Sequence, residues 1–364
     1  MKIPSSLITT LIFLFLFSQN SWGWGGRGHT SICAVDTNLV SEPGLKDFLQ
    51  MRPHVMGHLC NIPDIYWKGI NAEITQMGHP PHFFQSEILE ADINNIPTDF
   101  KKLVEKYTGM PNKFNPDLKI ISVAREVGSL WWRADQFYRL ALGLKEDFKK
   151  AVPPTQRSEE QNEELLYNKT IFSLMTNLGL MGHFTGDASQ PVHNSADYDG
   201  YKAGHGGIHA YYEETVITYF DADMQARIAA EARKLKKSTP AFLKAGSVVE
   251  KMQALSALSY SDLKKIYKLD PVLKPSIIKK ENGIEIKTPA VRKPAQEGYK
   301  VFNELIVKEM ARSALLTAQL WDEAYVALGK PNLSAYRSFK FPFNPEFVPP
   351  DYLETVNSQI EKTK

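Results

Sequence analysis

The sequence has few cysteines and almost no net charge. Cys33 and Cys60 are the only two cysteines in 364 residues. They are too few to staple the fold, but they form either one disulfide in an oxidising compartment or two buried thiols. Because the formal net charge is only +2, charge alone does not attract nucleic acid. An acidic substrate would therefore need local features, such as metal ions.

The sequence also lacks a hydrophobic run long enough to span a membrane. Its most apolar segment, residues 7–17, is shorter than the ~20 residues that a spanning helix needs. This run follows a basic residue and precedes a polar stretch with small residues at Ser21 and Gly23, which is typical of a cleaved signal peptide. We therefore predict a signal peptide over residues 1–23 and a secreted or periplasmic protein whose mature chain begins at Trp24.

Helical periodicity dominates the remaining sequence. Apolar residues recur at three- and four-residue spacing over residues 120–144, 160–184, 210–220, 222–235, 247–260 and 297–328. Strand-like alternation is confined to residues 277–287, where Asn282-Gly283 marks a tight turn. We predict an all-α, compact multi-helix single domain over residues 24–330 with a short β-hairpin insertion, followed by a C-terminal tail over residues 331–364.

Two pairs of potential metal ligands lie four positions apart. His183 and Asp187 form one pair, and His209 and Glu213 form the other. On a helix, residues at this spacing share a face and lie about 5–6 Å apart. A proline after Asp187 should end the first helix, so that His193 reaches a second centre. Since imidazole and carboxylate are good zinc ligands, five donors in thirty-one residues favour metal binding over five separate structural roles.

Further donors lie in the first part of the chain. Signal-peptide cleavage would give Trp24 a free α-amine beside its carbonyl oxygen, and His29 adds an imidazole. An amine binds metal only when deprotonated, and its ordinary pKa of about 7.7–8.0 makes this easy near a cation. Asp64 and His82 are the best candidates to complete the first centre. The alternatives are a helix-capping role for Asp64 and a ligand role for His79 in place of His82.

These motifs together resemble the zinc-dependent phospholipase C/S1/P1 nuclease superfamily, mostly helical enzymes that hold three zinc ions at the bottom of a cleft. The resemblance covers residues 24–328. The pattern Trp-Gly-x-x-Gly-His at residues 24–29 matches the nuclease branch. The pattern His-Phe-x-Gly-Asp-x-x-Gln-Pro-x-His at residues 183–193 matches both branches and is highly specific.

The resemblance implies three zinc ions and their ligands. Asp64, His82, His183 and Asp187 would hold one zinc, His193, His209 and Glu213 a second, and Trp24, His29 and Asp187 the third. Asp187 would then bridge two metals, and Asp64 and Asp187 are the candidate catalytic residues. We expect zinc to lower the pKa of water from about 15.7 to about 7, so that activated water attacks phosphorus without a separate protein base.

The sequence carries features of both branches. In the nuclease branch, an aspartate usually stands in place of Glu213, an arginine in place of Trp67 and an aspartate in place of Gln85. A glutamate in the last pair is typical of the phospholipases. The tight spacing of residues 24–29 is instead nuclease-like, and Arg27 replaces an acidic residue that phospholipases carry near the N-terminus.

The N-terminal spacing favours a nuclease/3′-nucleotidase that cuts single-stranded DNA or RNA, and the alternative is a phospholipase C that releases phosphorylated head groups. Phe83, Phe84 and Lys68 flank the early ligands and are candidate substrate contacts, since base stacking on an aromatic ring contributes about 1–3 kcal/mol. Core packing of the rings and a surface role for the lysine are the alternatives. A third hypothesis is an exported protein with structural zinc. We expect a monomer without a stable protein partner.

Overall fold

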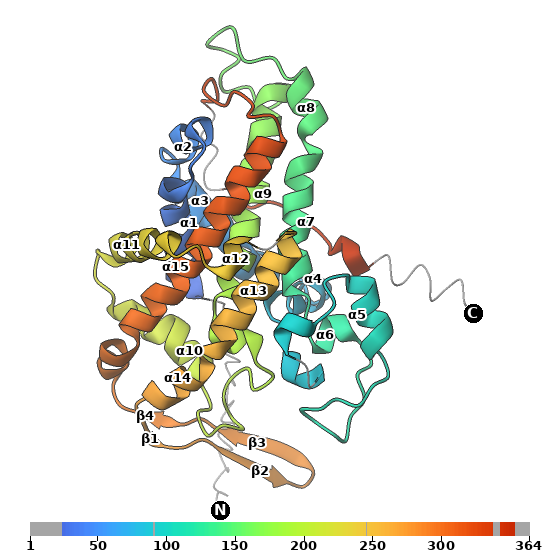
Figure 1. The fold of residues 1–364 in the computed structure, drawn as a ribbon, viewed down its shortest axis with the longest axis vertical. Coiled ribbons are helices and arrows are strands. Elements are labelled where there is room, and N and C mark those ends of the chain that lie inside the picture. The colour runs from blue at the N-terminus through green and yellow to red at the C-terminus, as the bar shows by residue number, and fades with distance from the viewer. Residues whose placement is uncertain (1–23, 90–91, 245, 338–342, 354–364) are drawn as a thin grey trace, which may run out of the picture.

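Helices form most of the regular structure in this computed structural model, and two pairs of short strands lie together at one end (Figure 1). The structure describes residues 24–89, 92–244, 246–337 and 343–353. The predicted signal peptide over residues 1–23 lies outside the described residues. No helix in the described part of the chain is both long and apolar enough to cross a membrane.

The elements follow one another along the chain with short connections. The α-helices are α1 (Gly25–Leu39), α2 (Pro43–Leu49), α3 (Pro53–Ile65), α4 (Ala72–Gly78), α5 (Phe100–Tyr107), α6 (Val123–Glu126), α7 (Leu130–Gly143), α8 (Lys145–Lys150), α9 (Leu166–Ala188), α10 (Ile208–Ala210), α11 (Met224–Lys237), α12 (Ala241–Lys244), α13 (Val248–Ser261), α14 (Leu263–Leu269) and α15 (Ala295–Ala327). Shorter helical turns are η1 (Trp67–Gly69), η2 (Pro80–His82), η3 (Ser86–Leu89), η4 (Ile93–Asn95), η5 (Pro191–Asn194), the π-helical turn η6 (Tyr211–Thr215), η7 (Ile217–Tyr219) and η8 (Asp351–Leu353). The strands are β1 (Val272–Lys274), β2 (Ile277–Glu281), β3 (Ile284–Thr288) and β4 (Val291–Arg292).

The predicted helical content is confirmed, with ends that differ from the periodic segments. The segments 160–184 and 297–328 correspond to α9 and α15, the two longest helices described. The segment 120–144 is split into α6 and α7 because Gly128, between them, has φ +98°, a conformation that glycine adopts without strain. A Cβ at this position would lie 2.0 Å from the carbonyl oxygen of Phe83, so the chain after η2 can approach only because residue 128 is glycine.

Helix α9 lies at the centre of the helical body and packs against α1, α3, α7 and α15 (Figure 1). Most of its side chains from Leu174 to Ala188 are buried, on all faces rather than on one stripe. A helix that is surrounded by others must be apolar or internally paired all round. The polar residues near its C-terminal end, His183 and Asp187, are therefore buried together with the core.

A disulfide links α1 to α3. Cys33 and Cys60 are bonded, with their Cα atoms 6.3 Å apart, which resolves the alternative that the sequence left open. Gly182 on α9 faces this bond, and a Cβ there would lie 2.5 Å from the Cys33 Sγ atom. His29 lies one helical turn before the first cysteine, and Asp64 lies one turn after the second. The disulfide therefore ties together two helices that carry predicted metal ligands.

The predicted β-hairpin is confirmed between α14 and α15. Strands β2 and β3 are antiparallel, and Ile277 is opposite Thr288. Asn282 and Gly283 both have positive φ values, 51° and 82°, as a tight two-residue hairpin turn requires. The second pair, β1 with β4, was not predicted because strands of two or three residues are too short to show alternation.

The described parts of the predicted C-terminal tail wrap the helical body. Tyr336 and Tyr352 are buried within the main hydrophobic cluster. The Trp67 indole N–H, from η1, donates a hydrogen bond to the carbonyl oxygen of Pro345 at 2.9 Å. These contacts attach residues 331–337 and 343–353 to the same core as the helices.

Asp36 on α1 is completely buried in this core. Its burial outweighs the neighbouring Thr317 hydroxyl and raises the pKa of the carboxyl well above its ordinary value. A folded-state pKa above the unfolded value means that stability is full below about pH 4 and falls as the pH rises toward the folded-state pKa.

We therefore expect Asp36→Asn to stabilise the protein relative to the wild type, and increasingly so at higher pH. With metal removed by a chelator, the difference in free energy of unfolding should grow by about 1 kcal/mol or more between about pH 5 and about pH 8. Urea unfolding at both pH values measures this difference, and Asp117→Asn, on the exposed surface, is the control. A difference that does not change with pH would contradict the assignment.

Candidate metal centre

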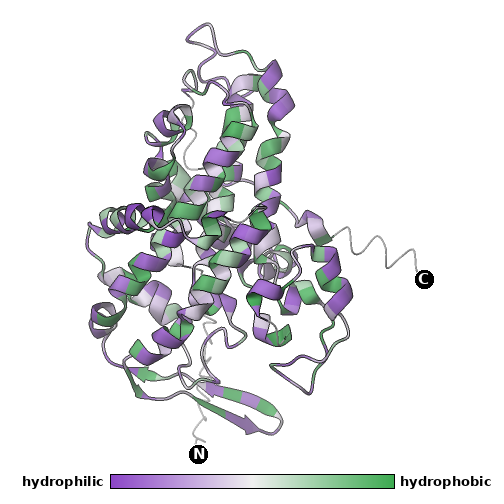
Figure 2. Cartoon of the chain, in the orientation of Figure 1, coloured by the Kyte–Doolittle hydropathy of each residue, from purple (hydrophilic) through white to green (hydrophobic). Residues whose placement is uncertain are grey.

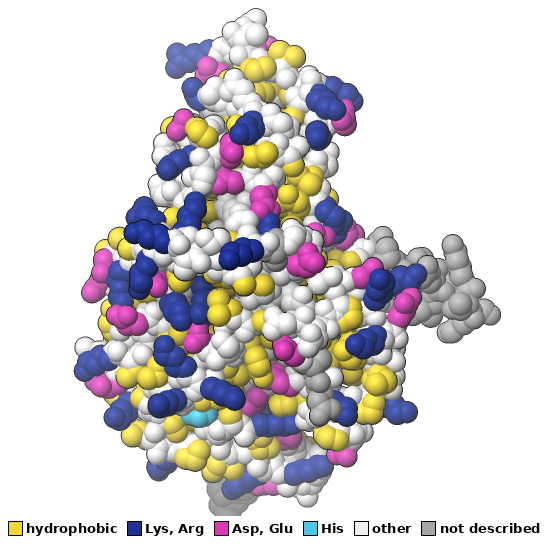
Figure 3. Space-filling model, viewed as in Figure 1, with side chains coloured by type: hydrophobic (Ala, Val, Ile, Leu, Met, Phe, Trp, Pro, Cys, Tyr) yellow, Lys and Arg dark blue, Asp and Glu magenta, His cyan; other side chains and the backbone are white. Residues whose placement is uncertain are grey.

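The eight predicted side-chain ligands converge from separate elements. All of them are buried: His29, Asp64, His82, His183, Asp187, His193, His209 and Glu213. They come from α1, α3, η2, α9, η5, α10 and η6. Consistent with this burial, almost no histidine (cyan) is visible on the face shown in Figure 3. The centre is therefore interior and polar.

These side chains form three overlapping groups, each with ligand atoms within 4.8 Å of one another. The groups are His82 with His183 and Asp187 (the His82 group), His193 with His209 and Glu213 (the His209 group), and His29 with Asp64 and His183 (the His29 group). The His209 group has the predicted members. In the other two, Asp64 lies nearer to His29 than predicted, and His183 belongs to both groups.

In the His82 group, two imidazoles and one carboxylate face each other. The Nδ1 atom of His82 lies 2.9 Å from Asp187 Oδ2 and 3.0 Å from His183 Nε2. The other nitrogen of His183, Nδ1, lies 2.7 Å from the Cys60 carbonyl oxygen and donates to it. This bond leaves the lone pair on Nε2, directed at the Asp187 carboxylate, which is the arrangement typical of metal-binding histidines.

The His209 group repeats this pattern. The Nε2 atoms of His193 and His209 lie 2.8 Å apart, and His209 Nε2 lies 2.9 Å from Glu213 Oε2. His193 donates through Nδ1 to the His82 carbonyl oxygen at 2.8 Å, so its Nε2 lone pair points into the group. The amide of Gln190 donates to Glu213 Oε2 at 2.6 Å and orients this carboxylate.

The helix that carries His209 and Glu213 is irregular. The chain begins as α10 and continues as the π-helical turn η6. Single π-helical turns occur often at functional sites because the extra residue shifts a side chain around the helix. Here the turn carries Glu213, whose carboxylate reaches His209 inside the protein.

The His29 group contains several polar atoms without a hydrogen-bond partner among the described residues. They are both ring nitrogens of His29, Asp64 Oδ2 and Asp187 Oδ1. His29 Nε2 lies 3.4 Å from Asp187 Oδ1 and 4.0 Å from Asp64 Oδ2. A buried polar atom without a partner costs about 1–3 kcal/mol. A cation between these atoms would satisfy them together, so this donor set fits a metal ion.

Trp24 lies beside the His29 group. Its indole N–H donates to the Gly186 carbonyl oxygen at 2.8 Å and lies 3.1 Å from Ser189 Oγ. The next residue, Gly25, has φ +54°, and a Cβ there would lie 3.2 Å from the Glu213 carbonyl oxygen. Trp24 is therefore held between α9 and η6. Its predicted α-amine depends on a cleavage site outside the described residues and stays a prediction.

The electrostatic environment suits ligand binding. Burial lowers the pKa of His29 and lowers that of His82 to about 3, so both rings are neutral at neutral pH and offer a lone pair. Burial alone would raise the pKa of Asp187, but His183 and His193 hold it well below its ordinary value. Neutral imidazoles around an ionised carboxylate are the protonation states that zinc requires.

The three predicted substrate contacts have different environments. Lys68 Nζ lies 2.5 Å from Asp64 Oδ1, so this ammonium lies beside the centre. Phe83 is almost buried and packs edge-on against Tyr198, with ring centroids 5.7 Å apart. Phe84 is completely buried and stacks on Trp131 at 3.9 Å. Phe84 is therefore a core residue that a substrate cannot reach, and its alternative interpretation applies.

Two other residues discussed from the sequence lie away from the metal groups. His79, the alternative to His82, packs against Phe83 with ring centroids 5.4 Å apart and belongs to none of the three groups. Trp67, where the nuclease branch has an arginine, is buried and stacks on Phe137. This position is structural here and does not contact the centre with a charge.

Tyr198 was missed by the sequence reasoning. Its hydroxyl lies 3.3 Å from His193 Nε2, and its ring centroid lies 4.2 Å from that of His209. It stands in the irregular segment between η5 and α10, where no periodicity indicates which side chains turn inward. It is the described aromatic residue in closest contact with the His209 group.

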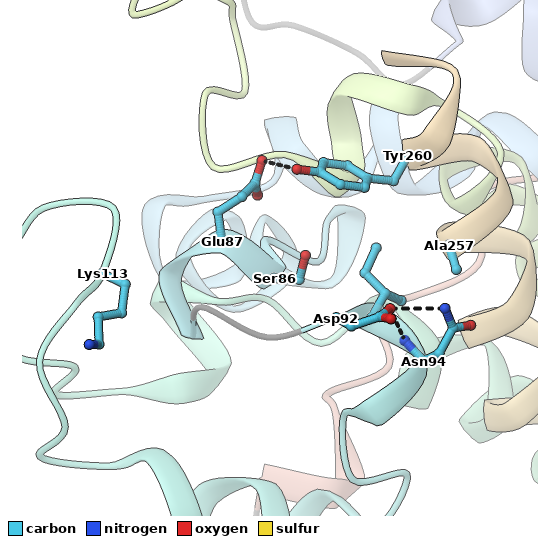
Figure 4. Close-up of a pocket in the computed structure, with 8 residues that line it drawn as sticks. Ser86, Glu87, Asp92, Asn94, Lys113, Ala257 and Tyr260 are labelled. Atoms are coloured by element: carbon cyan, nitrogen blue, oxygen red, sulfur yellow. Dashed lines mark hydrogen bonds between the residues drawn. The ribbon is translucent and has the colours of Figure 1, made fainter. Parts of the chain in front are cut away.

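Glu87 was also missed. Its carboxylate accepts hydrogen bonds from the Ser195 hydroxyl at 2.9 Å, the Ala196 amide at 2.8 Å and the Tyr260 hydroxyl at 2.9 Å. Figure 4 shows the last of these at the edge of a cavity of about 520 Å³ that contains none of the predicted ligands. Glu87 fixes the chain just after His193. Residues so far apart in the sequence give no local signal of this contact.

The comparisons with known proteins found no relative. No protein-family model, no curated protein and no solved structure matches the chain. The centre is therefore interpreted from its own geometry and from the sequence motifs.

The close approach of α9 to His29 gives a test of the His29 group. A Cβ on Gly186 would lie 2.8 Å from the His29 ring. We expect Gly186→Ala to displace this ring and weaken metal binding there, so that the protein retains at least about one zinc ion fewer after dialysis. Elemental analysis measures the retained zinc. Gly143→Ala, on α7 with no atom near the added methyl, is the control, and equal zinc retention in both variants would contradict the geometry.

Proposed function

We propose that this protein is a zinc-dependent hydrolase of phosphate esters. The observation that carries the proposal is the convergence of eight buried imidazole and carboxylate side chains, with unpartnered atoms around His29. Its support from sequence is the resemblance of residues 24–29 and 183–193 to the zinc-dependent phospholipase C/S1/P1 nuclease superfamily. The number of ions, three, rests on that resemblance.

The ligands in this proposal are those already named, with Asp187 shared between metals. Zinc would lower the pKa of water and neutralise the charge of the phosphate. The chain supplies the rest: Asp187 contacts the His82 group through Oδ2, and its Oδ1 faces His29. Asp64 lies between the His29 and His82 groups, and the Lys68 ammonium beside it would attract the anionic substrate.

A purely structural role for the metals is the weaker proposal. A structural zinc site is a closed set of four ligands, whereas this centre has eight donors in three overlapping groups. The disulfide and the large hydrophobic core already stabilise the fold. More donors than stability requires favour chemistry as the reason for the centre.

For the substrate, we propose single-stranded nucleic acid first and phospholipid second. The spacing of residues 24–29 supports the nuclease, and Phe83 with Tyr198 is an aromatic pair next to the His209 group that could stack on a base. Glu213 supports the phospholipase C, because a glutamate in this position is typical of that branch. The signal-like N-terminus and the disulfide support an exported protein.

The shared role of Asp187 predicts unequal losses of metal. Protein that starts at Trp24 should hold about three zinc ions, Asp187→Asn about one, and His209→Ala about two, because only the aspartate lies between two groups. Elemental analysis after dialysis measures these contents. Asp117→Asn should retain the wild-type content. Equal losses in the Asp187 and His209 variants would contradict a shared ligand.

Hydrolysis of three substrates side by side tests the function. We expect zinc-loaded protein to cut single-stranded DNA and RNA, and Asp187→Asn to lose at least about a thousandfold in rate, comparable with the loss of a transition-state contact. Phosphatidylcholine in detergent micelles is the third substrate. Cleavage of the lipid alone would select the phospholipase. Full activity after prolonged chelation, or no cleavage of any of the three, would refute the proposed function.

A further inference from the structure

The hairpin formed by β2 and β3 exposes an unusual amount of apolar surface. Every residue of the two strands is exposed, and the exposed fractions of its isoleucines are 48% for Ile277, 38% for Ile278, 68% for Ile284 and 43% for Ile286. An isolated two-stranded hairpin is only marginally stable in water. Large exposed apolar side chains on such an element point to an interaction surface.

The register gathers three of these isoleucines on one face. Residues directly opposite each other in an antiparallel pair project to the same side. Ile284 is opposite Glu281, and Ile286 is opposite Lys279. Because side chains alternate along a strand, Ile277 shares this side with Lys279. One face of the hairpin therefore presents isoleucines mixed with charged groups.

Lysine dominates the charge around this face. The segment 272–293 contains five lysines and two glutamates, and Arg292 is paired with Asp270 in the loop below. Figure 2 shows hydrophobic and hydrophilic residues interleaved along the hairpin, and Figure 3 shows lysine or arginine side chains (dark blue) and hydrophobic ones (yellow) together at this end of the molecule. The surface is thus both apolar and basic.

The same segment contains no aromatic residue. Single-stranded nucleic acid is held by stacking on aromatic rings as well as by positive charge, so this surface lacks half of what such a partner needs. An anionic lipid surface needs apolar side chains that enter the interface and lysines that pair with the head groups. The hairpin carries both.

We propose that the β2–β3 hairpin docks this protein onto membranes that contain anionic phospholipid. The isoleucines of the hairpin enter the interface, and the surrounding lysines contact the lipid phosphates. This inference does not depend on the hydrolase activity, since docking requires neither metal nor catalysis.

The docking surface is joined to the metal centre by backbone contacts. The amide of Ser276 donates to the Gly204 carbonyl oxygen at 3.0 Å, and the amide of Ala290 donates to the Gly206 carbonyl oxygen at 2.9 Å. Gly206 lies three residues before His209. A membrane bound at the hairpin would therefore lie at the same end of the molecule as the segment that carries the His209 group.

Co-sedimentation with vesicles tests the proposal. The full chain should bind vesicles that contain about a third phosphatidylglycerol more tightly than vesicles of pure phosphatidylcholine, and salt should weaken binding. The triple variant Ile277→Ser, Ile284→Ser, Ile286→Ser should bind the anionic vesicles at least about tenfold more weakly. The matched control is Leu118→Ser, Ile121→Ser, Val152→Ser, whose residues are 55%, 83% and 65% exposed elsewhere on the surface.

A second variant separates charge from apolar insertion. Lys279→Gln with Lys280→Gln should remove most of the preference for anionic vesicles, without a change in the thermal unfolding midpoint. Binding that survives the isoleucine substitutions would overturn the proposal. So would a dimer that the isoleucine variant loses, or binding of a single-stranded oligonucleotide that the lysine variant loses when no vesicle is bound. Because sedimentation is scored without any cleavage, failure of docking and failure of the hydrolase function are distinguishable.

Discussion

Burial of the Asp187 carboxylate is the constraint on which the rest of the structure depends. An ionised carboxylate in the core is very costly unless it is paired. Here, ring nitrogens of His29, His82, His183 and His193 lie 2.9–3.4 Å from its two oxygens. These rings come from α1, η2, α9 and η5, so helices and loops distant in sequence must meet at one point. The contacts that satisfy this charge are also the contacts that define the fold around α9.

Such convergence requires helices to approach α9 more closely than side chains ordinarily allow. Gly179, Gly182 and Gly186 lie three and four residues apart and thus on one face of this helix. A Cβ at these positions would lie 2.4 Å from Leu59, 2.5 Å from the Cys33 sulfur and 2.8 Å from the His29 ring, respectively. Each glycine inside a helix costs about 1 kcal/mol relative to alanine. The disulfide and the buried pairs between α1, α3 and α9 offset this cost.

The sequence predicted those features that depend on local spacing. His183 with Asp187 and His209 with Glu213 are four residues apart, and an Asn-Gly turn between alternating residues marks the hairpin. It did not predict contacts that depend on packing between distant segments. The Glu87 carboxylate holds Ser195, more than a hundred residues away, and Phe84 is removed from any substrate by Trp131. Neither partner can be identified without knowing which helices are neighbours.

The same division applies to substrate choice. A centre of imidazoles and carboxylates can serve any phosphodiester, because the metal and the phosphate are common to nucleic acid and lipid. Discrimination must come from groups that touch the rest of the substrate. Phe83 and Tyr198, beside the His209 group, suit a base, whereas the exposed isoleucines and lysines of the hairpin suit a lipid surface. These two sets lie on different elements, so the chemistry and the location of the enzyme are separable: a protein held at a membrane can still act on a polymer in solution.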